Sequence, residues 1–202
     1  MNCLIISGGK FCKIKIKKSY DLIIVCDKGQ LYAKRMKIKP DLLIGDFDSS
    51  KPPRDKSFVI TVDSEKDDTD TSLAVKYALR NGYKNIDLIF ALGNRIDHTI
   101  ANISILKYIY ENGGNGVIIS DDAKIFVAGI GNTKIKKEKN SFLSIFSLTD
   151  KTEVNYIRGS KYDLKNVTFK NSFPLGVSNE FVKDTVSINV KKGMLLIVIQ
   201  KM

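Results

Sequence analysis

Two aspartates separated by one residue, Asp46 and Asp48, come directly after the apolar run 42–44. Such a run predicts a buried strand, and ionised carboxylates at its end are costly unless a cation neutralises them. Carboxylate oxygens suit a hard divalent ion such as Mg²⁺, which often keeps phosphate oxygens in its coordination shell. The alternative is an ordinary polar turn, because Asp, Gly and Ser are common turn residues.

Polar residues also follow the other predicted strands in the first half of the chain. They comprise Gly8, Gly9, Asp27, Asp67, Asp68, Asp70, Asn94, Arg95, Asp97 and His98. Because ligands of an open parallel sheet bind beyond the carboxyl ends of its strands, we expect these residues to share one edge. Acids at this density repel one another unless a cation lies among them, and an arginine beside a helix N-terminus suits phosphate. The pattern therefore predicts a site for Mg²⁺ and a nucleoside triphosphate.

The elements that must position these residues alternate along the chain. Strands are predicted at 4–6, 21–26, 42–44, 58–62, 86–91 and 117–119, and helices at 31–36, 69–80 and 97–111. This alternation is typical of a mostly parallel sheet with helices on both faces. The apolar stripes of the two longer helices are predicted to be Leu73, Tyr77 and Ala78 in one, and Ile100, Ile103, Leu106 and Tyr110 in the other.

Several of the polar residues have a purely structural alternative. Asp67 or Asp68 is a candidate N-cap for the helix at 69–80, and Asp97 for the helix at 97–111. An aspartate N-cap contributes about 1 kcal/mol. His98, the single histidine of the chain, could be packed or exposed.

The pattern changes near residue 125, after which no helical period is evident. Short alternating runs occur at 142–146, 153–157, 166–169, 185–190 and 195–199, with turn residues between them. This spacing is typical of an all-β sandwich or barrel. We therefore predict an α/β catalytic domain at 1–130 and a β-sandwich domain at 131–202, with the boundary between 129 and 140.

Composition limits the class of protein. The chain has 202 residues, 43% hydrophobic, and its longest apolar runs are too short to span a bilayer. Three cysteines without Cys-x-x-Cys spacing, and no recognisable signal peptide, favour a cytoplasmic protein. The net charge of +11 raises the possibility of nucleic-acid binding, but the lysines are scattered, which favours solvated faces. We expect neither a nucleic-acid nor a membrane partner.

Five segments together resemble the motifs of the thiamin pyrophosphokinase family. They are GDFDS at 45–49, KDDTD at 66–70, RIDH at 95–98 followed by Ala101 and Asn102, GSKYDL at 159–164 and VSNEF at 177–181. The resemblance covers nearly the whole chain in order. It implies an α/β catalytic domain, a C-terminal β-sandwich and a homodimer with active sites between subunits. It also implies transfer of a pyrophosphoryl group from ATP to thiamin, with Mg²⁺ required and AMP released.

The resemblance assigns roles to individual residues. The implied Mg²⁺ ligands are Asp46, Asp48 and Asp67. The implied catalytic set is Asp46, Asp48, Asp67, Asp70 and Arg95. The implied nucleotide-binding set is Asp27, Arg95, Asp97, His98 and Asn102. The implied thiamin-binding residues are Ser178, Asn179 and Glu180.

Two features depart from the family's pattern. Asn94 stands where the family usually has a second glycine, so the backbone approach to phosphate is expected to differ. The chain has no tryptophan to stack on the pyrimidine of thiamin, which leaves Phe173, Phe181 or a tyrosine for this role.

Three other functions compete with this interpretation. A phosphatase of the haloacid dehalogenase type also places Asp-x-Asp after a strand, but its later acidic pair is missing from the sequence. A pyrophosphokinase acting on another hydroxymethyl heterocycle, such as a pterin, could share the catalytic domain. A basic nucleic-acid-binding module would need lysines clustered with aromatic side chains, whereas the predicted functional edge is acidic.

Overall fold

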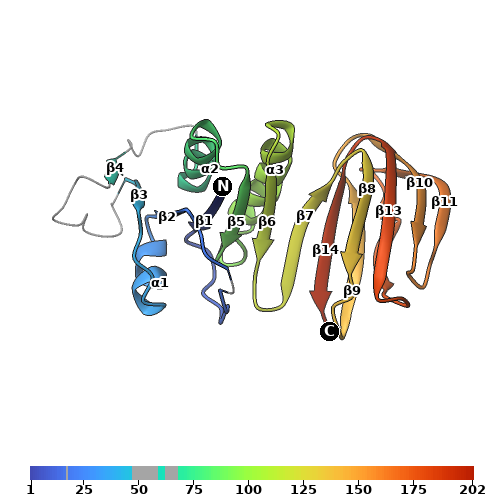
Figure 1. Cartoon of the computed structure of the whole chain (residues 1–202), viewed down its shortest axis with the longest axis horizontal. Helices are drawn as coiled ribbons and strands as arrows, with labels where there is room; N and C mark the ends of the chain where they lie inside the picture. Colours follow the sequence, from blue (N-terminus) through green and yellow to red (C-terminus); the bar gives the residue numbers. More distant parts are fainter. Residues whose placement is uncertain (17, 47–58, 62–67) are drawn as a thin grey trace. The chain divides into compact units, whose positions relative to one another are not determined.

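The computed structural model describes residues 1–16, 18–46, 59–61 and 68–202. The chain divides into two compact units, Met1–Asp121 and Asp122–Met202 (Figure 1). The predicted boundary lay several residues later, between 129 and 140. Asp48 and Asp67, two of the expected metal ligands, lie outside the described residues.

The first unit is built on a parallel sheet. Its strands are β1 (Asn2–Ile6), β2 (Leu22–Cys26), β3 (Leu42–Gly45), β4 (Val59–Thr61), β5 (Asn85–Ile89) and β6 (Asn115–Ile119). Its helices are α1 (Gly29–Arg35), α2 (Asp70–Arg80) and α3 (Ile96–Glu111). The strands lie in the order β6-β5-β1-β2-β3-β4, and every neighbouring pair is parallel. This confirms the predicted alternation of strands and helices.

The strand order reverses between β1 and β5. From β1 the chain moves outward through β2, β3 and β4, and α2 then carries it back to β5 on the other side of β1. Strand β1 therefore pairs on both sides: Leu4, for example, is paired with Ile23 of β2, and Ile5 with Leu88 of β5. A crevice opens beyond the carboxyl ends of the strands at such a reversal, because the two connections leave toward opposite sides of the sheet.

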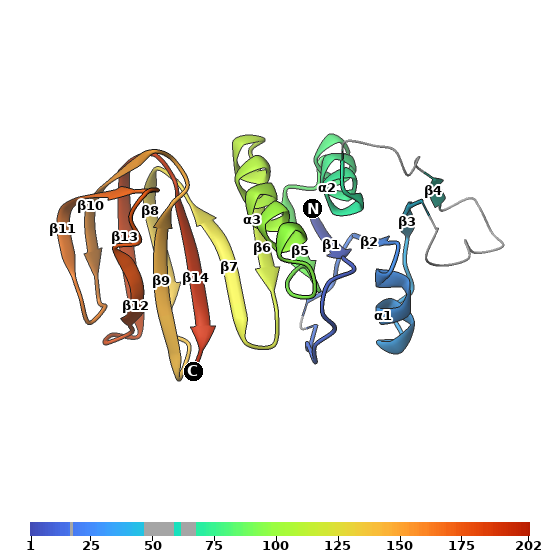
Figure 2. The same ribbon diagram turned by 180° about the vertical axis from the view of Figure 1, so that it is seen from behind.

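Helices cover both faces of this sheet. Ala33 of α1 packs in one apolar cluster with Leu4 and Ile6. Cys3 and Ile5 alternate with these residues along β1, so they point to the opposite face, and both are fully buried. The neighbouring helices α2 and α3 lie on that second face (Figures 1 and 2).

The buried stripes of α2 and α3 differ from the predicted ones. The buried residues are Thr71, Ala74, Val75 and Ala78 in α2, and Asn102, Leu106 and Ile109 in α3. The small alanine side chains let α2 approach the sheet closely, while the larger Leu73 and Tyr77 are only partly buried beside them. Ile100, expected in the stripe of α3, is 60% exposed. Ala78 and Leu106 were predicted correctly, whereas the other predicted members of the two stripes are only partly buried or exposed.

The second unit consists of antiparallel strands. These are β7 (Ala123–Ala128), β8 (Gly131–Lys136), β9 (Ser141–Ser147), β10 (Lys151–Arg158), β11 (Leu164–Lys170), β12 (Gly176–Glu180), β13 (Thr185–Lys192) and β14 (Leu195–Lys201). One layer has the order β12-β9-β14-β7 and the other β11-β10-β13-β8. Side chains from both layers, among them Leu143, Ile197 and Ile188, form a single apolar core. The sequence did not predict β7, β8 or β12 as strands.

None of the helices in the described parts of the chain has the length and apolar character needed to span a bilayer.

The segment between β1 and β2 is fastened to the sheet by a buried carboxylate. Asp87 of β5 accepts a hydrogen bond of 2.7 Å from the Tyr20 hydroxyl and forms an ion pair of 2.8 Å with Lys18 Nζ. Burial, together with the hydrogen bond to Asp87, raises the pKa of Tyr20 above its usual value. Tyr20 therefore remains a neutral donor to Asp87 at any physiological pH.

We expect Asp87→Leu to lower the free energy of unfolding by about 2–3 kcal/mol, because it leaves the part-buried Tyr20 hydroxyl without its acceptor. Asp87→Asn should cost less, since its amide oxygen can still accept that hydrogen bond. Urea denaturation of the three proteins provides the measurement. Equal losses in the two variants would contradict the role assigned to the Tyr20 hydrogen bond.

Candidate active site

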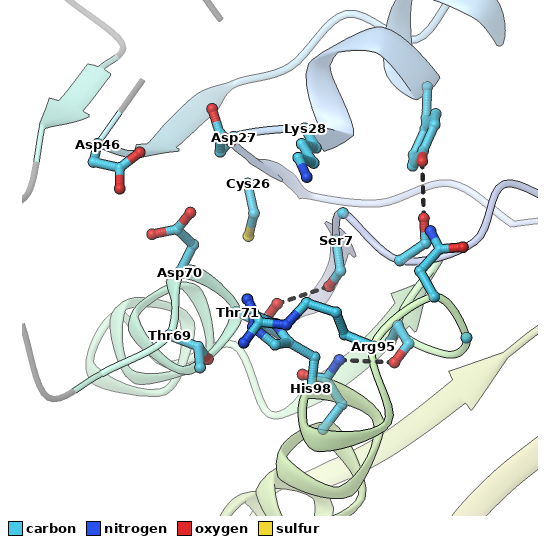
Figure 3. A pocket seen from close by; sticks show the side chains of 17 residues that line it. Ser7, Cys26, Asp27, Lys28, Asp46, Thr69, Asp70, Thr71, Arg95 and His98 are labelled. Atoms are coloured by element: carbon cyan, nitrogen blue, oxygen red, sulfur yellow. Dashed lines mark hydrogen bonds between the residues drawn. The ribbon is translucent and has the colours of Figure 1, made fainter. Parts of the chain in front are cut away.

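A pocket of about 530 Å³ lies at the carboxyl edge of the parallel sheet, where the strand order reverses (Figure 3). This volume lies within the range of small-molecule sites. Six of the residues with an expected catalytic or nucleotide-binding role line it, namely Asp27, Asp46, Asp70, Arg95, His98 and Asn102. Gly8, Gly9 and Asn94, which were expected at the same edge, line it as well. Asp97 contacts Arg95 at its margin.

The turn after β1 forms one wall of the pocket and is held tightly. The Gly9 amide donates a hydrogen bond of 2.7 Å to the Phe90 carbonyl, and the Tyr32 hydroxyl donates one of 2.8 Å to the Gly9 carbonyl. A Cβ atom on Gly9 would lie 2.5 Å from the Phe90 oxygen and 2.6 Å from the Leu92 oxygen. Tyr32 and Phe90 also contact each other edge to face, with ring centroids 5.0 Å apart. Only glycine fits at this position.

The turn after β5 forms the facing wall. Gly93 and Asn94 both have positive φ, at +78° and +61°. Asparagine tolerates this left-handed conformation better than most residues, so Asn94 can adopt it where the family usually has glycine. The Gly93 amide donates to Thr99 Oγ1 at 3.1 Å, and the Arg95 amide donates to the Gly93 carbonyl at 2.8 Å. These bonds join the turn to the start of α3.

The first turns of α2 and α3 face the pocket. Thr69 caps α2, because its hydroxyl accepts a hydrogen bond of 3.1 Å from the Ser72 amide. The suggestion that Asp68 caps this helix is therefore wrong; Asp68 forms an ion pair of 2.6 Å with Lys76 instead. Asp97 is not the N-cap of α3 either, since that position belongs to Arg95. The N-termini of these two helices carry a partial positive charge from the helix dipole, which favours anions in the pocket.

Two buried hydrogen bonds tie these helix starts to the sheet. The Thr71 and Ser7 hydroxyls lie 3.0 Å apart, and both residues are buried. The amide of Asn102 donates a bond of 2.7 Å to the carbonyl of Ala91. Asn102 is thus bonded through its amide nitrogen to the backbone after β5, and it also lines the pocket.

Arg95 lines the pocket, and Asp97 holds its side chain in one orientation. It donates to both carboxylate oxygens of Asp97, at 2.6 Å and 3.2 Å. These hydrogen bonds lower the pKa of Asp97 and raise that of Arg95. Asp97 also accepts a bond of 2.9 Å from the His98 amide. Both charged side chains are largely exposed, so the pair contributes orientation more than stability.

The acidic residues provide the donors expected for a hard cation. Asp27 follows β2, Asp46 follows β3 and Asp70 opens α2, and the carboxylates of Asp46 and Asp70 point toward each other in Figure 3. Within residues 1–16, 18–46, 59–61 and 68–202, no three His, Cys, Asp or Glu side chains gather closely enough to hold a metal ion. Carboxylate oxygens are nevertheless the ligand type that Mg²⁺ prefers, so the chemistry of the set fits this ion.

The predicted thiamin-binding residues lie in the second unit, on the edge strand β12. Asn179 is buried, donating to the Tyr162 carbonyl at 3.1 Å and accepting from the Tyr162 amide at 3.0 Å. Glu180 forms an ion pair of 2.7 Å with Lys161. Ser178 has a φ of +59°, at an irregularity in the pairing of β12 with β9. The amide of Asn179 therefore holds the backbone at Tyr162.

The aromatic residues considered as stacking platforms differ in exposure. Phe181 is only 7% exposed and belongs to the core of the second unit, which leaves neither ring face open. Phe173 and Tyr162 are 64% and 60% exposed. Burial therefore disfavours Phe181, while Phe173 or a tyrosine stays the prediction for the stacking platform.

Several residues of the pocket were not identified from the sequence, and four of them have side chains that shape it. Ser7 and Thr71 form the buried hydroxyl pair, Tyr32 holds the Gly9 carbonyl, and Lys28 projects into the pocket from the start of α1. A serine or threonine beside glycines and acidic residues does not by itself indicate a functional site. Ser7 directly follows β1 and Lys28 lies two residues after β2, and these positions could have indicated both residues.

We expect Gly9→Ala to lower the free energy of unfolding by about 3 kcal/mol, because its Cβ would overlap two backbone carbonyls that cannot move independently. Gly8→Ala is the matched control. A Cβ there would lie 3.0 Å from the Lys28 Cβ and 3.9 Å from its Cα but would overlap no backbone carbonyl, so the loss should be smaller, about 1 kcal/mol. Thermal or urea denaturation compares them. Similar losses at both positions would contradict the close approach at Gly9.

Comparison with known proteins agrees with this geometry. Residues 14–118 match the thiamin pyrophosphokinase catalytic domain, and residues 132–195 match the thiamin pyrophosphokinase vitamin B1 binding domain. The chain is 26% identical over 186 residues to a thiamine pyrophosphokinase of Bacillus subtilis, covering 89% of this chain and 87% of the relative.

Solved structures show the same fold. A thiamin pyrophosphokinase family protein from Enterococcus faecalis superimposes with a TM-score of 0.85 at 27% identity, over the full length of both chains. The thiamine pyrophosphokinase structure from Bacillus subtilis has a TM-score of 0.90 at 23% identity, again over both full chains. Two family matches that together span most of the sequence establish that this chain belongs to the thiamin pyrophosphokinase family.

Proposed function

We propose that this protein transfers the pyrophosphoryl group of ATP to the hydroxyl of thiamin, giving thiamin diphosphate and AMP. Membership of the family supports this activity. The observation that carries the proposal is the convergence of Asp27, Asp46 and Asp70 with Arg95 on one pocket where the strand order reverses. Such a pocket combines donors for a divalent cation with donors for phosphate oxygens.

ATP would lie with its phosphates between the turns at Gly9 and Gly93. The amides at the starts of α2 and α3 would donate to phosphate oxygens, and Arg95, held by Asp97, would present its guanidinium to them. Mg²⁺ would be held by Asp46 and Asp70, together with Asp48 and Asp67 as the family resemblance implies. When bound, this ion neutralises charge on the phosphates.

The reaction is a direct displacement at the β-phosphorus. The oxygen of the thiamin hydroxyl forms a new bond to that phosphorus, and the bond from it to the α,β-bridging oxygen breaks. AMP leaves with the bridging oxygen, and a carboxylate takes the hydroxyl proton. Asp46, Asp48 and Asp67 remain the candidates for this base. The residues contribute mainly by positioning the reactants and by stabilising charge.

The acceptor and assembly follow from the family resemblance. We assign thiamin to the region of Ser178, Asn179 and Glu180. We also propose a homodimer with active sites between subunits, and a cytoplasmic location. Asn179 supports acceptor binding by fixing the backbone of the neighbouring loop at Tyr162, which is the role its two hydrogen bonds suggest.

The products of a reaction with Mg²⁺, ATP and thiamin test the proposed activity. Chromatography with mass detection should show thiamin diphosphate and AMP in equal amounts. A parallel reaction with a hydroxymethyl pterin should give no diphosphorylated product. Formation of ADP, or transfer to the pterin in preference to thiamin, would contradict the proposal.

We expect Asp70→Asn to reduce kcat at least about 100-fold, because it removes a charged oxygen donor from the centre of the pocket. Asp68→Asn is a matched control two residues away. Asp68 is paired with Lys76 and does not line the pocket, so kcat should change less than about threefold. Steady-state kinetics under saturating ATP and thiamin gives both values. A control that loses as much activity as Asp70→Asn would refute the placement of Asp70.

A further inference from the structure

Lys28 has a position that the family motifs do not explain. It follows β2 and is the N-cap residue of α1. Its side chain is exposed and lines the pocket, with the ammonium group directed toward the pocket interior in Figure 3. A Cβ on Gly8 would lie 3.0 Å from Lys28 Cβ, so the lysine stem passes beside the turn after β1.

Lys28 has no evident role in stabilising the fold. As the N-cap residue it makes no side-chain capping hydrogen bond, and the first turn of α1 contains no acidic residue. In the described part of the chain, Lys28 takes part in no ion pair. A positive charge at a helix N-terminus is moreover unfavourable, because it opposes the helix dipole. The fold therefore keeps a cation where it gains nothing from it structurally.

The other charges in the pocket explain why a lysine at position 28 would be useful. Asp27, Asp46 and Asp70 make the pocket acidic, while the guanidinium of Arg95 is already paired with Asp97. A nucleotide polyphosphate adds several negative charges, most of them beyond the α-phosphate. An ammonium on a flexible stem is well suited to such oxygens, since it acts as a mobile point charge with three donors.

We infer that Lys28 is a binding residue for the β- and γ-phosphates of the nucleotide, the portion that is transferred. This inference rests on the proposed function for the identity of the donor. It distinguishes Lys28 from Arg95, whose orientation is fixed by Asp97 in the protein alone. Lys28, by contrast, forms no ion pair with any of the described residues, so binding phosphates would break none of these contacts.

The test is calorimetric titration with α,β-methylene-ATP in a buffer containing Mg²⁺. This analogue resists cleavage between the α- and β-phosphorus atoms, where the proposed reaction breaks ATP. Lys28→Met should weaken binding about tenfold or more, the effect of losing one hydrogen bond to a charged group. Lys28→Arg should restore most of the affinity. AMP, which lacks the β- and γ-phosphates, should bind Lys28→Met and wild type equally.

Lys34→Met serves as the matched control, since Lys34 is exposed in the last turn of the same helix and does not line the pocket. It should leave affinity for the analogue unchanged. Thermal unfolding separates binding from stability: Lys28→Met should have a midpoint equal to or above that of the wild type, because the unfavourable charge at the helix start is gone. A clearly lower midpoint would overturn the inference by revealing a structural role.

The outcomes also separate this inference from the proposed function. Unchanged binding of the analogue to Lys28→Met, in an enzyme that does form thiamin diphosphate, refutes the role of Lys28 alone. An equal loss of affinity for AMP refutes it as well. If the wild type binds the analogue but forms no thiamin diphosphate, the proposed reaction fails while the binding comparison still decides the role of Lys28. A wild type that binds no analogue refutes both.

Discussion

The contact of the Gly9 backbone with the carbonyls that follow β5 is the constraint on which the pocket depends. The amide of Gly9 is bonded to the Phe90 carbonyl, and no side chain fits between Gly9 and the carbonyls of Phe90 and Leu92. This closeness brings the two turns at the strand reversal together and leaves their polar groups facing the same space. Tyr32 supports the arrangement from α1 through its hydrogen bond to the Gly9 carbonyl.

The pocket combines opposite charges in separate places. Carboxylates enter from the ends of β2 and β3 and from the start of α2, as Asp27, Asp46 and Asp70. Helix amides, Arg95 and Lys28 supply positive potential around them. A cation and a polyphosphate bound together would satisfy both sets, whereas either alone would leave one set uncompensated. This is the physical reason for favouring a metal–nucleotide complex over a simple anion or cation.

The sequence predicted the parallel unit well because its short apolar strands end at conspicuous polar residues. Asp27, Asp46, Asp70 and Arg95 were placed correctly at the sheet edge, since strand direction alone determines this. Features that depend on tertiary contact were not predictable in this way. The buried faces of α2 and α3 and the strand β8 depend on partners distant in sequence, whereas the Thr69 cap is a local contact with Ser72. Tyr32 belongs to the same class, because its hydroxyl partner lies 23 residues away.

The central claim is that the donor phosphates lie where the strand order reverses between β1 and β5. A crystal structure of the protein with Mg²⁺ and α,β-methylene-ATP tests it most directly. We expect phosphate density between the turns at Gly9 and Gly93, within hydrogen-bonding distance of Arg95 and of the amides that begin α2 and α3. Phosphates bound elsewhere, with this pocket filled only by solvent, would contradict the account.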